Sequence, residues 1–306
     1  KFFFHLNHKL MSSSLKILNR YNKKIYSQFG EDGIIQEILN RIETKNLDNW
    51  CVEFGARDGI SDSNTYNLIK NYNYKAVLIE GDKTYFNKLC KNFMSDEIIK
   101  LNKFVDFEGE DSLDKILQKT KIPKNFDFLS IDIDGCDYFI YENLKFYRPK
   151  IICIEFNHAI PNEVQFIQEK NFNTKQGTSA LSLINLAKNK KYLLVGCTLT
   201  NLFFVDEIYK NKVLGDSEIN FDEIRNDKNI KNIIFSGYDG SLHTTLPIEI
   251  SWHKLIITNK KFQILPSFLR RFPDDYNFFQ KFLFLVFREI LYPGRFIKKI
   301  KSLLKG

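Results

Sequence analysis

The chain has 306 residues, of which 43% are hydrophobic and 27% charged, and its formal net charge at pH 7 is +8. This length and composition predict a protein with a substantial core, and they exclude a disordered chain, a collagen-like chain and a small disulfide-rich domain. The excess of lysine and arginine favours acidic partners, although lysine-rich surfaces that bind no partner are equally common.

The cysteines and the apolar runs indicate the cellular compartment of the protein. The five cysteines are odd in number and far apart in sequence, and three lie in apolar strand-like runs, where cysteine acts as a small hydrophobe. This favours a reducing compartment over a disulfide framework or a zinc site. Residues 1–4 lack the features of a secretory signal, and the apolar run 282–287 is too short to span a bilayer. We expect a cytoplasmic protein, with the inner face of the membrane as a surface that it can touch.

Apolar periodicity predicts helices alternating with strands from residue 26 to residue 210, after a basic helical lead-in at 1–25. Each predicted strand is a continuous apolar run, which is typical of a mainly parallel sheet with helices on both faces. A closing strand pair is expected to add an antiparallel edge strand. In chain order the helices are expected at 30–45, 62–72, 83–93, from Ser112, 137–146 and 178–190, and the strands at 50–55, 75–80, 98–105, 126–132, 151–155, 192–196 and 202–205.

Residues 211–306 lack this rhythm and are predicted to form a separate C-terminal extension. They are richer in charge and proline, and 276–291 is strongly aromatic. The last segment, 295–305, mixes apolar and basic residues in the manner of a helix that lies on anionic lipid. Packing on its own domain or on a second copy in a homo-oligomer is the alternative, and both interpretations stay open.

The first predicted strand ends in an acid, Glu53, followed by a glycine turn with Gly55 and Gly59. Glycines there let a ligand approach the backbone closely. The second strand ends at Glu80, where an acid can accept both hydroxyls of a ribose. The glycines are fewer than in the fingerprint that holds a pyrophosphate. The loop can instead carry side chains such as Arg57 and Asp58, which suits S-adenosylmethionine as the nucleoside cofactor. The alternatives are an ordinary turn and a solvated strand-end acid.

More polar side chains follow the third, fourth and fifth strands. Asp106 lies just past the third strand, where it can meet an adenine amino group. Asp132 and Asp134 follow the fourth strand, and Glu155, Asn157 and His158 follow or end the fifth. Two like charges held close need a cation, a proton or a hydrogen-bond donor, and carboxylate and amide oxygens suit Mg²⁺. His158 is either a general base or an ordinary loop histidine.

Five segments resemble the FkbM-type class I methyltransferases, in that family's order: 26–33 (YSQFGEDG), 52–59 (VEFGARDG), 63–65 (SNT), 78–82 (LIEGD) and 129–135 (LSIDIDG). The likeness covers about residues 26–206. It implies a Rossmann-like class I methyltransferase sheet, S-adenosylmethionine as the methyl donor and often a sugar hydroxyl as the acceptor.

Carried over by position, the resemblance assigns roles to single residues. Glu53 and Gly55 line the methionine end of the cofactor, and Glu80 holds the ribose. Asp132 and Glu155 face the acceptor, and Asp132 is also counted among the cofactor-binding residues. Some related sugar and catechol methyltransferases bind Mg²⁺ at this edge, but here the residues after the fifth strand are spaced Glu155-x-Asn157 rather than adjacent. That departure leaves the metal set Asp132, Glu155 and Asn157 open. The resemblance also places three further residues at the border of the cofactor pocket: Ser27, Gln28 and Asn64.

The leading hypothesis is O-methylation of a sugar hydroxyl in a surface glycan or its precursor, which is a step of polysaccharide biosynthesis. Asp132, Asp134 and His158 are the predicted catalytic residues. A metal-dependent glycosyltransferase that uses Asp132-Ile133-Asp134 is one alternative, although it leaves the Gly55 loop unexplained. A basic protein that binds nucleic acid or membrane without catalysis is the other. We expect no nucleic acid partner, because the strand-end acids repel phosphates.

Overall fold

The structure is a computed structural model that describes residues 18–292 and residue 294. Most of the predicted helical lead-in, and the basic segment 295–305, lie outside the described residues. The chain divides into two compact units, with the boundary between Asp227 and Lys228. We call them the sheet unit and the C-terminal unit, and each is described by itself.

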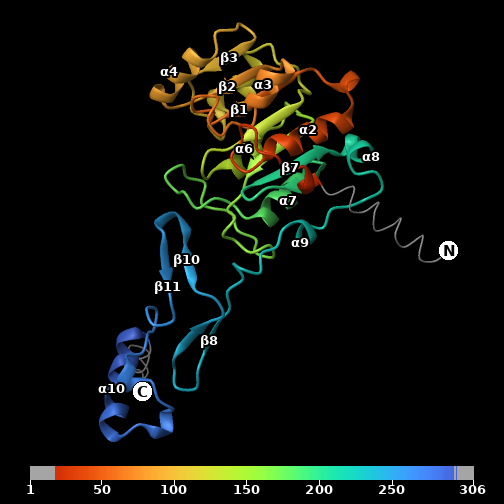
Figure 1. The fold of residues 1–306 in the computed structure, drawn as a ribbon. Helices are drawn as coiled ribbons and strands as arrows, with labels where there is room; N and C mark the ends of the chain where they lie inside the picture. The colour runs from red at the N-terminus through yellow and green to blue at the C-terminus, as the bar shows by residue number, and fades with distance from the viewer. Residues whose placement is uncertain (1–17, 293, 295–306) are drawn as a thin grey trace, which may run out of the picture. The chain divides into compact units, whose positions relative to one another are not determined.

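The sheet unit contains a seven-stranded sheet in the order β3-β2-β1-β4-β5-β7-β6 (Figure 1). The first five strands are parallel, and their order reverses between β1 and β4, as in doubly wound α/β folds. The predicted mainly parallel sheet is confirmed. The closing hairpin supplies the reversed strand, which is β7 and lies between β5 and the edge strand β6. The strands are β1 (Trp50–Phe54), β2 (Lys75–Ile79), β3 (Ile98–Leu101), β4 (Phe128–Ile131), β5 (Ile151–Glu155), β6 (Tyr192–Cys197) and β7 (Asn201–Asp206).

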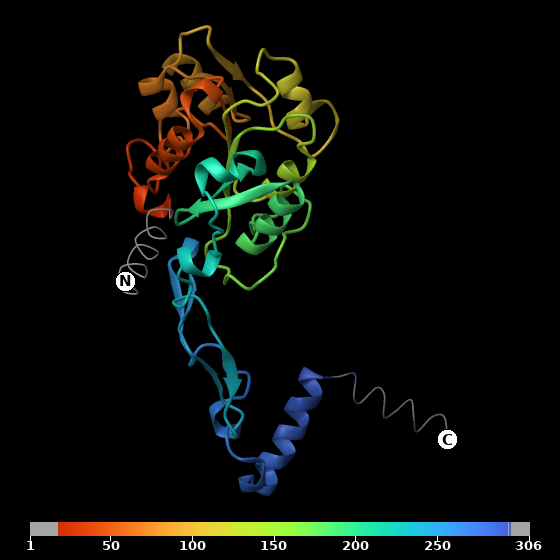
Figure 2. The same cartoon turned by 90° about the vertical axis from the view of Figure 1, so that its right-hand side faces the viewer.

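Helices cover both faces of the sheet, because neighbouring residues of each buried strand point to opposite faces. In β1, Cys51 belongs to one core cluster and Val52 to the other. The cluster of Cys51 includes residues of α2 (Glu31–Ile42), α3 (Tyr66–Tyr72), α4 (Lys83–Asn92) and α8 (Lys210–Val213). The cluster of Val52 includes residues of α5 (Leu113–Gln118), α6 (Asp137–Asn143) and α7 (Ala180–Asn189). Figures 1 and 2 show these layers.

Residues 211–227 pack with the sheet unit, although the sequence predicted the extension to begin at 211. They include α9 (Phe221–Ile224), whose Phe221 packs against the core. The Arg225 guanidinium donates to the carbonyl oxygen of Ile160 at 3.1 Å, and Asn162 Nδ2 donates to Asp222 Oδ1 at 2.9 Å. These contacts tie the segment to the loop after β5. The four short 3₁₀ turns of this unit are at Leu18–Tyr21, Thr44–Asn46, Gly109–Asp111 and Glu207–Tyr209.

The C-terminal unit consists of two antiparallel hairpins followed by a helix (Figure 2). The helix α10 (Phe278–Leu291) begins with a capping box between Asn277 and Gln280. Tyr276 is one of its few buried residues, and its hydroxyl donates to the Leu269 carbonyl oxygen at 2.5 Å. No helix among the described residues is long and apolar enough to cross a bilayer. The strands are β8 (Ile234–Ser236), β9 (Leu242–Thr244), β10 (Ile248–Ile250) and β11 (Leu255–Ile257), with 3₁₀ turns at Ser251–His253, Ser267–Leu269 and Pro273–Asp275.

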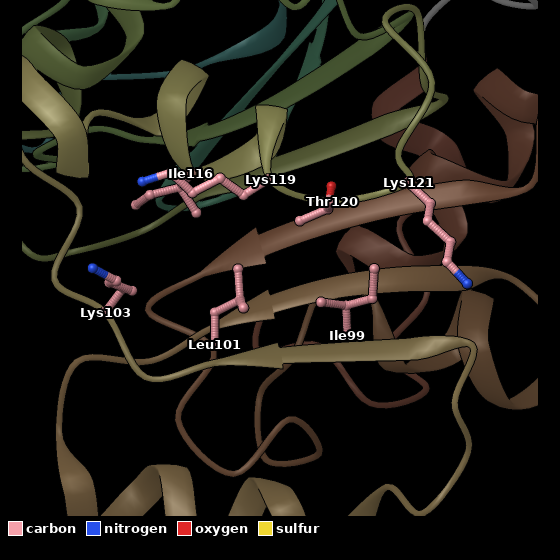
Figure 3. Close-up of a pocket in the computed structure, with 7 residues that line it drawn as sticks. All are labelled: Ile99, Leu101, Lys103, Ile116, Lys119, Thr120 and Lys121. Atoms are coloured by element: carbon pink, nitrogen blue, oxygen red, sulfur yellow. The ribbon is translucent and has the colours of Figure 1, made fainter.

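A small apolar pocket opens beside the edge strand β3, between it and α5 (Figure 3). Two of its lysines bind nearby acids, with Lys103 Nζ at 2.6 Å from Asp111 Oδ1 and Lys119 Nζ at 3.0 Å from Glu110 Oε2. None of the residues that the sequence singles out lines this pocket, so the candidate site lies elsewhere. Its lining consists of Ile99, Leu101, Lys103, Ile116, Lys119, Thr120 and Lys121.

Candidate active site

The carboxyl ends of β1, β4 and β5 are in register. Phe54 pairs with Ile131, and Ile131 pairs with Ile154. The next residue of each strand, namely Gly55, Asp132 and Glu155, therefore stands at the same level of the sheet. Asn201, on the reversed strand β7, pairs with Glu155. It therefore extends this row of residues at the sheet edge by one strand. This is the edge at which open α/β sheets bind their ligands.

Gly55 must be glycine for a steric reason. Its φ is +73°, and a Cβ atom built on it would lie 2.0 Å from the carbonyl oxygen of Asp132. Any side chain would push apart the loop after β1 and the end of β4. The predicted glycine turn is confirmed, and it serves first to bring these two backbone segments together.

Glu53 fixes the loop that follows this turn. Its carboxylate accepts from Ser63 Oγ at 2.6 Å, from Thr65 Oγ1 at 2.7 Å and from the backbone N–H of Asn64 at 2.9 Å. Burial raises the pKa of Glu53, and these three hydrogen bonds act against that rise. Asn64 Nδ2 in turn donates to Ser130 Oγ on β4 at 3.0 Å. The contact of Glu53 with the methionine end of a cofactor stays a prediction.

Glu80, at the end of β2, is buried and ordered by the backbone. Its Oε2 accepts from the N–H of Arg57 at 2.7 Å, and its Oε1 accepts from the N–H of Asp82 at 2.6 Å. Each carboxylate oxygen can accept a second hydrogen bond, so the pair keeps capacity for two hydroxyl groups. Arg57 is held in the left-handed region, with its guanidinium over the ring of Tyr85, and Asp58 accepts from Ser61 inside the turn.

The other predicted cofactor residues have different surroundings. Ser27 is buried and donates through its N–H and its Oγ to Asp32 Oδ2, both at 2.8 Å. A bridge to Asp62 places Ser27 beside the turn after β1. Gln28 is exposed. Asp106 is also exposed, and its carboxylate accepts from the N–H of Phe107 at 2.6 Å. The structure ties Asp106 to the segment before α5 rather than to the row at the sheet edge.

Asp132, Asp134 and Glu155 form a cluster in which one carboxylate oxygen from each lies within 4.8 Å of the others. Burial, and after it the repulsion of neighbouring carboxylates, raises the pKa of Asp132 to about 7 and that of Glu155 to about 9. Full ionisation of the cluster at neutral pH would therefore need a compensating cation. Three carboxylate oxygens at this spacing also fit a hard divalent cation.

The cluster contains Asp132 and Glu155 of the predicted metal set with Asp134 beside them, and the ligand role of Asn157 stays a prediction. Asn157 Oδ1 accepts from the N–H of Ala159 at 2.9 Å, and its Nδ2 donates to the Gln176 carbonyl oxygen at 2.7 Å. His158 is half-buried, and its carbonyl oxygen accepts from Arg225 Nη2 at 2.5 Å. That hydrogen bond fixes its backbone, while the catalytic role of its ring stays a prediction.

Two buried acids of this region were not singled out in the sequence. Asp137 accepts from the N–H groups of Ile133 and Gly135, both at 3.0 Å, and so shapes the loop that carries Asp134. Glu31, in the first turn of α2, is fully buried and raises the pKa of Asp132 further. The sequence signal for Glu31 was present in the GEDG motif, but acids in a first helical turn are ordinarily assigned to the helix dipole.

Glu31 joins α2 to the strand row. Its Oε1 accepts from Thr198 Oγ1 at 2.6 Å and from Asn201 Nδ2 at 3.2 Å. Two polar atoms beside these contacts, Asp32 Oδ1 and Asn201 Oδ1, are buried without a hydrogen-bond partner. Because buried polar atoms in folded proteins are nearly always paired, both are suited to a ligand that carries hydrogen-bond donors.

The comparisons with known proteins concern the centre of this unit. The sequence profile described as the methyltransferase FkbM domain matches residues 110–192, which run from before α5 to the start of β6. Of the five motifs, 129–135 lies within this match and the other four precede it. No protein of curated function matches the sequence.

Solved structures of methyltransferases resemble the chain only distantly. A SAM-dependent methyltransferase from Aquifex aeolicus has 11% identity and a TM-score of 0.36, and the match covers 63% of this chain and 96% of that one. An O-methyltransferase from Bacillus cereus in complex with SAH has 14% identity and a TM-score of 0.35, and covers 64% and 100%. TrmK from M. capricolum with S-adenosyl-homocysteine has 17% identity and a TM-score of 0.32, and covers 54% and 65%.

The profile match includes two of the strands whose ends form the row at the sheet edge. The match includes β4 with Asp132 and Asp134, and β5 with Glu155. The profile match therefore confirms the resemblance to FkbM-type methyltransferases, and this match extends over residues 110–192 of the chain.

Proposed function

We propose that the protein transfers the methyl group of S-adenosylmethionine to a hydroxyl group of a sugar, in a surface glycan or its precursor. The observation that carries the proposal is the concentration of carboxylates at one sheet edge, where Glu31, Glu53 and Asp137 are buried and Asp132 and Glu155 are half-buried. S-adenosylmethionine carries a sulfonium and an ammonium group, and a site rich in carboxylates attracts both. The methyltransferase FkbM domain match supports the same reaction class.

Glu80 and the Gly55 turn supply the cofactor side in this proposal. Each carboxylate oxygen of Glu80 is held by one backbone N–H. In this proposal both oxygens also accept hydrogen bonds from the hydroxyls of the ribose. The Gly55 turn packs directly on the end of β4, and in this proposal the methionine part of the cofactor lies over that junction. Asp32 Oδ1 and Asn201 Oδ1 are the further acceptors available to the ammonium group.

Asp132 acts as the base toward the acceptor. The acceptor oxygen forms a bond to the methyl carbon, the carbon–sulfur bond breaks, and sulfur keeps the electron pair as a neutral thioether. The hydroxyl proton passes to the Asp132 carboxylate, whose raised pKa of about 7 makes it a stronger base than an ordinary aspartate. Holding oxygen, carbon and sulfur in line can lower the barrier by about 7–11 kcal/mol at best. His158 is the second candidate for the base.

A divalent cation such as Mg²⁺ is the optional part of the proposal. The three carboxylate oxygens of Asp132, Asp134 and Glu155 would hold it. When bound, such an ion makes a sugar hydroxyl easier to deprotonate. Activity that survives extensive chelation, in protein shown to be metal-free, would remove the ion from the proposal and leave the base role of Asp132.

Calorimetry with S-adenosylmethionine tests the cofactor part. We expect saturable binding by the full chain, and a loss of at least about tenfold in affinity for Glu80→Ala, because a buried charged hydrogen-bonding partner is removed. The matched control is Glu97→Ala, a solvent-exposed acid of the same sheet unit that pairs with Lys75. Absence of binding, or an equal loss in both variants, would reject the cofactor assignment.

Transfer of a labelled methyl group tests the acceptor part. We expect label on the oxygen of a sugar when glycans are offered, and none on nucleic acid. Label on nitrogen or carbon would overturn the hydroxyl acceptor and leave the methyltransferase reaction. Binding of a nucleotide sugar with Mn²⁺ in preference to S-adenosylmethionine would instead support glycosyl transfer.

A further inference from the structure

The charge of the chain is divided unequally between its two units. The C-terminal unit, Lys228–Gly306, contains fourteen Lys and Arg against five Asp and Glu, which gives it a formal net charge of +9. The sheet unit, Lys1–Asp227, contains thirty-one against thirty-two and is nearly neutral at −1. The basic character of the whole protein therefore comes from its last quarter.

The helix α10 of this unit presents its apolar side to solvent. Phe278 is 90% exposed, Phe282 57% and Ile290 70%. With Phe279, Leu285 and Val286, which are also exposed, these residues recur at three- and four-residue spacing and so share one face. We call this face the α10 stripe. A surface helix of a globular protein normally shows the opposite arrangement, with its polar residues outward.

The opposite side of the helix is the one that packs inward. Phe284 contacts the ring of the buried Tyr276, with centroids 5.6 Å apart. Arg288 is half-buried, and its Nη2 lies 3.2 Å from Oε1 of Glu289, an acid that follows Leu285 by four residues and so lies on the side of the stripe. The helix is thus already seated on its own unit, and the stripe faces away from that contact.

Basic residues occur within and on both sides of the α10 helix in the sequence. Lys281 is exposed in its first turns, and Arg271 is exposed on the loop before the helix. Beyond the helix, the sequence from Arg295 to Lys305 adds five more cations and no acid. An apolar face accompanied by cations in the sequence matches the two chemistries of a bilayer surface that contains acidic lipid, with acyl chains for the aromatic side chains and headgroup phosphates for the cations.

We propose that the C-terminal unit docks on the surface of an anionic lipid bilayer through the α10 stripe and the neighbouring cations. A second copy of the chain would bring two units of charge +9 together, which disfavours self-association through this face. A nucleic acid would satisfy the cations and leave the apolar stripe in water. Docking does not rest on the methyltransferase assignment, because the stripe shares no residue with the sheet edge.

Co-sedimentation of the full chain with vesicles tests the docking. We expect binding to vesicles of phosphatidylcholine mixed with phosphatidylglycerol, and at least about tenfold weaker binding to phosphatidylcholine alone, since each cation near an acidic surface contributes about fivefold. Added salt should weaken the binding, because it screens exposed charges. Equal binding to both vesicle types, or binding to neither, would overturn the proposal.

Two sets of variants separate the apolar and the charged contributions. Phe282→Asp with Leu285→Asp, and separately Lys281→Glu, should each weaken binding to the acidic vesicles. Their matched controls in the sheet unit are Met94→Asp and Lys91→Glu, both at exposed positions, and these should bind as the parent does. Circular dichroism and S-adenosylmethionine binding check that every variant is folded. Variants and controls that bind alike would refute the stripe, as would a concentration-dependent dimer that the stripe variants dissociate while vesicle binding persists.

Discussion

The two units of this chain bury their aromatic residues to very different extents. In the sheet unit Phe54, Phe126, Phe128 and Phe203 are fully buried, whereas in the C-terminal unit the phenylalanines of the α10 stripe are mostly exposed. Both units are rich in apolar residues, so composition alone does not make a core. A core forms where strands with apolar side chains on both faces are covered by helices. In the described part of the C-terminal unit, the short strands β8 and β11 are mostly exposed.

Matched phenylalanine deletions give the largest test of this comparison. Phe128→Ala should destabilise the sheet unit by about 3–5 kcal/mol, because it removes a fully buried ring, whereas Phe282→Ala should stay within about 0.5 kcal/mol. The two tryptophans report on the units separately, because Trp50 lies in β1 and Trp252 in the C-terminal unit. Chemical denaturation followed by fluorescence, with the other tryptophan replaced by phenylalanine, measures each effect. Similar losses for both variants would contradict the exposure of the stripe.

Only substitutions in the sheet unit are expected to lower the rate of methyl transfer. Asp132→Asn should lower kcat by about 10²–10⁴-fold, as expected for loss of a general base. Asp134→Asn should have a smaller effect, because Asp134 is the exposed member of the cluster, and Asp274→Asn in the C-terminal unit should have none. Single-turnover methyl transfer at saturating cofactor measures all three. If His158→Gln abolishes transfer and Asp132→Asn does not, the base is the imidazole.

Two glycines of the sheet unit have left-handed backbones but differ in the space around them. Gly55→Ala and Gly109→Ala both force a side chain into this region, at about 1–2 kcal/mol each. Gly55→Ala should cost a further 1–3 kcal/mol or so, because its Cβ would meet the Asp132 carbonyl oxygen, whereas Gly109 has open space around it. Thermal unfolding and cofactor binding together measure the difference. Equal costs for the two substitutions would mean that β1 and β4 can separate freely at this edge.

The sequence was sufficient to predict the strands of the sheet and several of the residues at its carboxyl edge. Each core strand of the sheet unit lies at or near its expected position, because a strand buried on both faces must be a continuous apolar run. Asp132 and Glu155 were expected together because parallel strands end at one edge. Glu31 was not, since its partners Thr198 and Asn201 are 167 and 170 residues away in the sequence. The place of Asp134 beside these two acids depends on a local turn, in which Asp134 adopts a φ of +58°.

The charge division was visible in the sequence only once a boundary was known. A net charge of +8 describes neither unit, because the sheet unit is nearly neutral and the C-terminal unit strongly basic. The boundary lies after Asp227 rather than before residue 211, because Arg225 and Asp222 bind the loop after β5 through contacts that span 65 and 60 residues. Long-range hydrogen bonds of this kind leave no periodic signal in the chain.

The smallest effect of a substitution is expected at Glu155, and it concerns the pH dependence of the stability of the sheet unit. The pKa of Glu155 is raised from its usual 4.5 to about 9, so the folded state keeps a proton that the unfolded state has released across that interval. Stability is therefore highest at acidic pH and falls as the pH rises, by about 1.4 kcal/mol per pH unit for each proton concerned. Asp132 adds the same sign up to about pH 7. Glu155→Gln should remove part of this slope and raise stability near pH 8 by about 0.5–2 kcal/mol.

Asp274→Asn is the matched control in the C-terminal unit, where the acid is exposed. Denaturation at a series of pH values, read from Trp50, should show the slope in the parent and in this control, and a reduced slope in Glu155→Gln. A cation that binds the cluster favours its ionised form, so S-adenosylmethionine or Mg²⁺ should flatten the parent's profile and leave that of Glu155→Gln closer to its ligand-free course. A parent profile that is flat between about pH 5 and 8, and that rises with pH only below the usual Glu pKa of 4.5, would mean that Glu155 is ionised and paired in the folded state. The carboxylate row would then already be neutralised by the protein, and would have no excess charge with which to attract a cationic cofactor.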